Sequence, residues 1–216
     1  MSQSMKSQDL LLLLKLVSLE RQENTAAPVS PVALGIPDDW RGWSTNDLDQ
    51  GLKGTPLSLD EIYAVRALED ATGISKSEVS ASLRRSVNVG LAKYSRGSSV
   101  PRANTRALLE FVVHGLKYVF PADRGPLVRG IPTGHAAPVL AGRLLSAGEH
   151  VDVWEDAHGN VQGQRIIPLY RSVPRAVRRD AVLYAMLALV DAIRLGQERE
   201  SALAARLLAQ YMGRST

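Results

Sequence analysis

Hydroxyl and guanidinium side chains share one short segment of the sequence, KSEVSASLRR. Its serines and arginines are Ser77, Ser80, Ser82, Arg84 and Arg85. Short hydroxyl side chains allow a helix to come close to a partner and can bond to phosphate oxygens or base edges, while arginines reach phosphates or the edge of a guanine. These residue types indicate recognition of an anionic, hydrogen-bonding ligand such as nucleic acid.

Positive charge is concentrated around this segment. The chain of 216 residues has a formal net charge of +4, which by itself only permits an acidic partner. Between Gly73 and Arg106, however, seven basic side chains stand against one acidic side chain, Glu78. The side chains that we predict to contact DNA are Lys76, Ser77, Ser80, Arg84, Arg85, Lys93, Arg96 and Arg102. We expect the first five to read the major groove or its phosphates, and the last three to hold the backbone.

Other chemistry has little support in the sequence. The chain has no cysteine, which excludes disulfides, cysteine-ligated zinc and thiol catalysis. Its histidines lack metal-ligand spacing, and no catalytic or phosphate-loop motif occurs. We therefore predict no metal, no cofactor and no enzymatic activity. The histidines are His114, His135, His150 and His158.

The compartment predicted for the chain is the cytoplasm. The apolar run from Leu10 to Val17 is interrupted by Lys15 and is far shorter than the roughly 20 residues that span a bilayer. No small-residue cleavage site follows it, so we predict neither a signal peptide nor a membrane anchor.

Two helices joined by a glycine turn are expected to position the polar segment. Ser58 and Glu61 have the spacing of a capping box, which predicts a helix that ends at Gly73, where a left-handed residue is favoured. A second helix is predicted from Ser75, with Glu78 completing another capping box. The basic segment AKYSRGSSVPR that follows has the length of a hairpin. This order is typical of a winged helix-turn-helix.

The segment VRALEDATGISKSEVSASLRRSVNVGLA resembles the winged helix-turn-helix of MarR-type and related bacterial transcriptional regulators. The shared frame is Leu68, Thr72, Gly73, Ile74, Ser75, Val79, Ser80, Leu83, Gly90 and Leu91. The resemblance covers residues 65–92 and the following basic turn, and it implies a DNA-reading helix followed by a wing. Glu69 replaces a residue that is usually small in that family, and Val87 lies near a position that is usually Leu. The wing also looks shorter.

Further helices are predicted at both ends of the chain. The leucine-rich segment near the N-terminus predicts a helix from Ser7, buried either in the core or at a dimer interface. Residues 24–57 predict an irregular insertion pinned by Trp40 and Trp43. Residues 105–120 predict another helix, and two more are predicted between Pro174 and Met212.

The remaining segments favour irregular structure and one hairpin. Residues 122–150 are rich in glycine and proline, and predict loops with a short helix near residues 138–146. Arg129 and Thr133 in this stretch either cradle a phosphate or simply belong to an irregular loop. Residues 151–170 alternate like strands around a His158-Gly159-Asn160 turn, which predicts a β-hairpin.

The predicted fold is mainly α with a small β component. It comprises a winged helix-turn-helix DNA-binding domain at residues 1–121 and a C-terminal α+β domain at residues 122–216 for dimerisation or partner binding. The predicted function is sequence-specific DNA binding as a homodimeric transcriptional repressor. The alternative is an autoregulating antitoxin whose C-terminal domain neutralises a protein partner. A second basic patch, Arg175, Arg178 and Arg179, contacts flanking phosphates, a protein or solvent.

Overall fold

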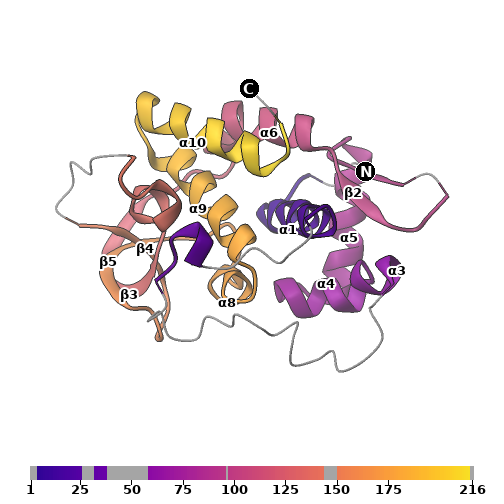
Figure 1. The fold of residues 1–216 in the computed structure, drawn as a ribbon, viewed down its shortest axis with the longest axis horizontal. Helices are drawn as coiled ribbons and strands as arrows, with labels where there is room; N and C mark the ends of the chain where they lie inside the picture. Colours follow the sequence, from indigo (N-terminus) through magenta and orange to yellow (C-terminus); the bar gives the residue numbers. More distant parts are fainter. Residues whose placement is uncertain (1–3, 26–31, 38–57, 96, 144–149, 215–216) are drawn as a thin grey trace.

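The computed structural model describes residues 4–25, 32–37, 58–95, 97–143 and 150–214. These residues form a mainly α-helical structure with a small β component, as predicted (Figure 1). No helix within these ranges has both the length and the apolar character needed to cross a bilayer. Most of the predicted insertion, including Trp40 and Trp43, lies outside the described residues. Within it, Val32–Leu34 forms the 3₁₀ turn η1.

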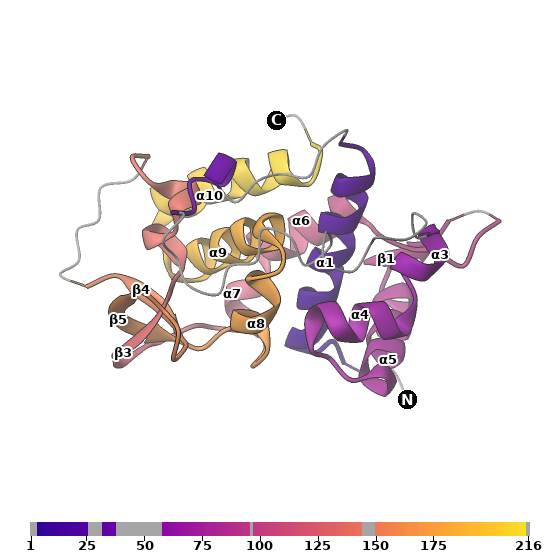
Figure 2. The ribbon, with the colours of Figure 1, turned by 60° about the horizontal axis from the view of Figure 1, so that its bottom comes forward.

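Helix α1 (Ser7–Glu23) runs through the middle of the molecule (Figure 2). It packs against α5 and β2 on one side and against α9 on the other. Its five consecutive leucines, Leu10–Leu14, are buried all round the helix within this single chain. The core interpretation of these leucines is therefore confirmed, and the dimer-interface alternative is wrong, because neighbouring elements of the same chain cover every side.

The predicted helix after Ser58 is broken in two. The Ser58–Glu61 capping box forms, with the Ser58 amide donating to the Glu61 carboxylate at 2.8 Å. Helix α3 (Leu59–Ile62) then ends, and α4 (Val65–Thr72) begins after extended Ala64. Tyr63 lies in the break and is buried, with its hydroxyl bonded to Glu23 of α1. The buried Tyr63 ring lies where the helix is interrupted between α3 and α4. The pattern of apolar residues in the sequence does not indicate this interruption.

Helix α5 (Lys76–Asn88) follows the Gly73 turn, and a short hairpin follows α5. Strands β1 (Ala92–Tyr94) and β2 (Pro101–Ala103) pair antiparallel, with Lys93 opposite Arg102. The next predicted helix forms as α6 (Thr105–His114) and α7 (Leu116–Val119). An apolar stripe continues across the change of helix at Gly115, since Leu108, Val112 and Leu116 are all buried.

The glycine- and proline-rich stretch contains a long strand where loops were predicted. Strand β3 (Arg124–Pro132) pairs antiparallel with both β4 (Asp152–Glu155) and β5 (Val161–Ile166). Strands β4 and β5 pair with each other in parallel, which closes a three-stranded barrel. The predicted β4–β5 hairpin is therefore wrong, although both of its strands exist. The chain turns after β4 and crosses β3 before it continues as β5.

This crossing depends on close backbone contact. A Cβ atom at Gly159 would overlap the backbone of Gly130, and a Cβ atom at Gly130 would overlap the backbone of Trp154. Glycine is the residue that permits such an approach. Gly130 and Gly159, which suggested a loop and a turn in the sequence, thus allow the barrel to close.

Two 3₁₀ turns, η2 (Gly134–Ala136) and η3 (Pro138–Leu140), follow β3. Of the short helix predicted near residues 138–146, η3 forms the first part, residues 141–143 form a turn, and residues 144–146 lie outside the described residues. Thr133 is buried and donates a hydrogen bond of 2.9 Å to Asp191, whereas Arg129 is exposed. The phosphate-cradle alternative is therefore wrong, because the Thr133 hydroxyl has an internal acceptor.

Helices α8 (Val173–Val177), α9 (Ala181–Leu195) and α10 (Glu198–Tyr211) complete the fold. The Asp180 carboxylate caps α9 and also pairs with Lys15 of α1 at 2.8 Å. Asp191 of α9 accepts a hydrogen bond from Trp154 of the barrel at 2.7 Å. One hydrophobic cluster extends across the predicted domain boundary at residue 121, so the two halves share a core.

Candidate nucleic-acid interface

The turn between α4 and α5 has the conformation that the sequence predicts. Gly73 adopts a left-handed conformation with φ of 69°. Thr72 donates its hydroxyl to the carbonyl of Leu68 at 2.5 Å, and the fully buried Ile74 side chain follows the turn. Leu68 and Val79 are buried at the contact of the two helices. A buried turn of this kind fixes the direction in which α5 leaves α4.

The start of α5 is capped in a different way from the prediction. Ser75 is the N-cap residue, but its side chain makes no capping hydrogen bond. Instead the Glu69 carboxylate of α4 accepts from the amide of Lys76 at 3.2 Å. This contact gives Glu69 a structural role at the start of α5. The predicted Ser75–Glu78 capping box is wrong, because Glu78 accepts hydrogen bonds from Lys6 and Gln8 of the N-terminal region.

The outward face of α5 carries four of the predicted contact residues. Lys76, Ser77 and Arg84 are exposed, and Ser80 is half-buried. Residues 76, 80 and 84 follow one another at four-residue spacing, so they form a single stripe along the helix. Neither the Lys76 nor the Arg84 side chain has a hydrogen-bond or ion-pair partner among the described residues. The outer stripe is defined as Lys76, Ser77, Ser80 and Arg84.

Arg85 faces the interior, contrary to the prediction. It is 4% exposed, and its guanidinium donates two hydrogen bonds to the Asp9 carboxylate of α1, at 2.9 and 2.6 Å. Ser82 donates to the same carboxylate at 2.5 Å. The hydrogen bonds to Asp9 raise the pKa of Arg85, against the opposing effect of burial. Arg85 is thus an internal ion-pair partner. It points to a different side of α5 from Arg84, because consecutive residues of an α-helix are turned by about 100°.

Asp9 is the buried partner of Arg85 that the sequence did not predict. It is fully buried and joins α1 to α5. A lone acidic residue immediately before five leucines was the available signal, since a carboxylate beside a buried apolar run requires a paired cation.

The β1–β2 hairpin points Arg102 toward α1, while Lys93 is exposed. Lys93 and Arg102 are cross-strand partners and so share one face of the hairpin. Arg102 pairs with Glu23 at 2.7 Å and stacks on the ring of Tyr63, with 4.7 Å between the guanidinium carbon and the ring centroid. The prediction that Arg102 is available to hold a DNA backbone is therefore corrected. Arg96 lies outside the described residues.

The Glu23–Arg102 pair shifts the ionisation of both groups. Burial acts to raise the pKa of Glu23, but hydrogen bonds from Arg102 and Tyr63 outweigh it, so the pKa is lowered. The hydrogen bond to Glu23 raises the pKa of Arg102. Both groups stay charged at neutral pH, which fixes the base of the hairpin to the end of α1.

No family model, curated protein or solved structure matches the chain. Across the described ranges, no group of three or more acidic or histidine side chains is arranged to hold a metal ion.

The C-terminal half of the chain supports the turn that aims α5. Ser172, just before α8, donates its hydroxyl to the carbonyl of Thr72 at 2.5 Å. Arg179 donates to the carbonyl of Asp70 at 3.4 Å. Of the second predicted basic patch, Arg178 pairs with Asp156, and Arg175 is exposed. The last turn of α4 is thus held from both sides, by α5 and by the segment around α8.

Proposed function

We propose that the protein is a sequence-specific DNA-binding regulator and that α5 lies in the major groove of duplex DNA. The observation that supports this most is the outer stripe: two cations and two hydroxyls on one exposed face of a helix whose opposite face is fixed in the core. The major groove is wide enough to admit an α-helix. A helix anchored along one side presents its other side in a defined orientation.

The side chains of the outer stripe have the sizes that groove binding requires. Ser77 and Ser80 are short, so the helix axis can approach the base edges and the hydroxyls can bond to bases or phosphates. Arg84 is long enough to bond both acceptors of a guanine, and Lys76 at the N-terminal end reaches a phosphate. Glu78, the one acidic residue of α5, accepts a hydrogen bond from Lys6.

The proposal includes a homodimer that represses transcription. One helix of this length reads only a few base pairs, and two copies on paired half-sites multiply both affinity and specificity. Sedimentation of the protein with a selected duplex tests the stoichiometry. Two chains per duplex are expected, and a single chain per duplex would contradict the dimer.

Selection from a pool of random duplexes tests the DNA-binding proposal. The bound duplexes are sequenced and their affinity is compared with that of an unrelated duplex at the same salt concentration. We expect enrichment of a common motif and a specific affinity roughly 10³-fold or more above the non-specific one. Binding that is equal for all sequences, or absent at low salt, would overturn the proposal.

A further inference from the structure

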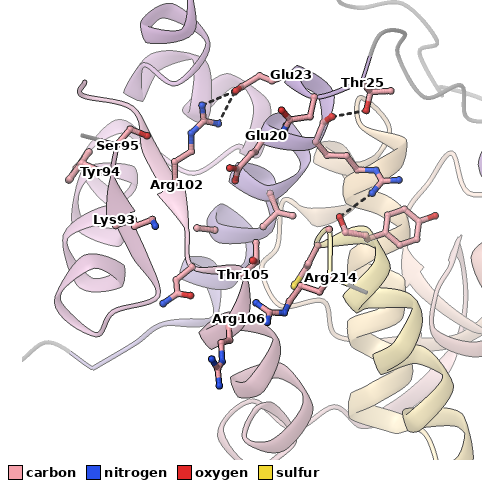
Figure 3. Close-up of a pocket in the computed structure, with 18 residues that line it drawn as sticks. Glu20, Glu23, Thr25, Lys93, Tyr94, Ser95, Arg102, Thr105, Arg106 and Arg214 are labelled. Carbon is pink, nitrogen blue, oxygen red and sulfur yellow. Dashed lines mark hydrogen bonds and ion pairs between the residues drawn. The ribbon is translucent and has the colours of Figure 1, made fainter. Parts of the chain in front are cut away.

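A large pocket opens beside the hairpin, and no residue of the outer stripe lines it (Figure 3). Its walls come from four places: the C-terminal end of α1, strand β1, the junction of β2 with α6, and the end of α10. We call it the tail pocket, because the last described residues of the chain, Met212–Arg214, form one wall. Its volume of about 1190 Å³ exceeds the range of drug-sized ligand sites, so a nucleotide-sized molecule has room to bind.

The lining of the tail pocket carries more positive than negative charge. Its cations are Arg21, Lys93, Arg102, Arg106 and Arg214, and its acidic residues are Glu20 and Glu23. The pair formed by Arg102 and Glu23 is internally neutral. Four cations then remain against Glu20 alone. Such an excess in a concave site favours an anionic occupant.

The remaining cations stand on separate walls. Lys93 comes from β1 and Arg214 from the chain end, and neither side chain has an ion-pair partner among the described residues. Among the described residues, Arg106 at the start of α6 pairs only with Glu110, and both of these side chains are well exposed, which makes the pair weak. Figure 3 shows Lys93, Arg106 and Arg214 around Thr105. A ligand that contacts all three walls needs more than one negative group.

Arg21 provides an unsatisfied donor in the same pocket. Its guanidinium donates to the carbonyls of Gln210 and Tyr211 at 3.3 Å and lies over the Tyr211 ring. Its Nε atom is buried and has no hydrogen-bond partner within the described part of the chain. Buried donors of this kind are uncommon in folded proteins. This one is closed off from solvent, so a ligand acceptor reaches it only if the Arg21 side chain moves.

From these observations we propose that the tail pocket binds a small polyanion bearing phosphate groups, such as a nucleoside polyphosphate. Phosphate oxygens bridge Lys93 on the hairpin and Arg214 on the chain end through charge-assisted hydrogen bonds. The ligand thereby joins the hairpin to the C-terminal helix. This site is separate from the outer stripe, so the inference goes beyond the proposed DNA binding.

Binding is measured without DNA, using inorganic pyrophosphate and ATP as probes at constant ionic strength. Calorimetric titration gives the affinity, and a rise in melting temperature with probe concentration gives an independent measure. We expect Lys93→Ala and Arg214→Ala each to weaken probe binding about tenfold or more, as loss of a charge-assisted hydrogen bond does. Arg84→Ala, which removes an arginine of the outer stripe, is the matched control and should leave probe binding unchanged.

Three results would overturn the inference. The first is that neither probe binds to the intact protein. The second is that Arg84→Ala weakens probe binding as much as Arg214→Ala, which would indicate non-specific charge attraction. The third is that Arg214→Ala weakens duplex binding as much as Arg84→Ala, which would assign the pocket to the DNA path. If the intact protein binds the probes but binds no duplex, the pocket is supported and the proposed regulator is rejected.

Discussion

Arg84 and Arg85 are adjacent in the sequence and lie in opposite environments. Arg84 is exposed on the outer stripe, and Arg85 is 4% exposed, with two hydrogen bonds to Asp9. The serines divide in the same way, since Ser80 lies on the outer stripe and Ser82 donates to Asp9. One face of α5 therefore holds the helix to α1, while the other is free to bind a partner. Residue type alone did not separate these two roles.

The largest expected difference between the two faces is in stability. Arg85→Ala leaves the Asp9 carboxylate buried without its cation, so we expect the free energy of unfolding to fall by about 3–5 kcal/mol. Arg84→Ala should change it by no more than about 0.5 kcal/mol, because the side chain is exposed. Urea unfolding of the two variants measures both values. Equal effects would remove the distinction between the faces.

The serines provide a milder form of the same test. Ser82→Ala removes a hydrogen bond to the buried Asp9 carboxylate, with an expected cost of about 1–3 kcal/mol. Ser80→Ala is the matched control on the outer stripe and should stay within about 0.5 kcal/mol of the wild type. If Ser80→Ala proves the more destabilising, α5 must be rotated relative to the structure described here.

Gly73 determines where both faces point. Gly73→Ala places a side chain at a φ of 69° and brings its Cβ atom to 2.8 Å from that of Ser172. The left-handed conformation alone costs about 1–2 kcal/mol for a residue with a side chain. We expect a loss of at least this size in thermal or urea unfolding, together with weaker DNA binding. A variant with unchanged stability would show that the turn is not constrained.

The smallest expected effect comes from Lys76. Lys76→Ala should leave the free energy of unfolding unchanged and weaken binding to all duplexes alike. The slope of log affinity against log salt concentration should decrease in magnitude by about 1, the value for one lost phosphate contact. Titrations at several salt concentrations measure the slope. An unchanged slope would remove Lys76 from the phosphate contacts.

Prediction from the sequence succeeded at several places where local signals decide the structure, although the predicted Ser75–Glu78 capping box does not form. The left-handed Gly73, the Ser58–Glu61 capping box and the strand-forming segments each depend on neighbouring residues, and the structure contains all of them. It failed where distant contacts decide. The barrel requires Gly130 to meet Gly159, which are far apart in the sequence, and strand β3 was therefore assigned to a loop.

The same division between local signals and distant contacts applies to the candidate site. The four residues of the outer stripe were predicted as contact residues, and Lys76, Ser77 and Arg84 are exposed on α5. Helical spacing could not show that Arg85 and Arg102 have acidic partners on α1, because Asp9 and Glu23 lie more than 70 residues earlier in the sequence. The regulator and antitoxin functions both remain predictions that depend on partners.

The most direct test of the central claim compares two arginines in a duplex-binding titration. Arg84→Ala and Arg199→Ala each remove one exposed arginine, the first from α5 and the second from α10 on the far side of the molecule (Figure 2). With a selected duplex at fixed salt, we predict that Arg84→Ala weakens binding by about 1–3 kcal/mol and relaxes specificity at one base pair, while Arg199→Ala has no effect. Equal affinities for the two variants would contradict the account that α5 reads DNA.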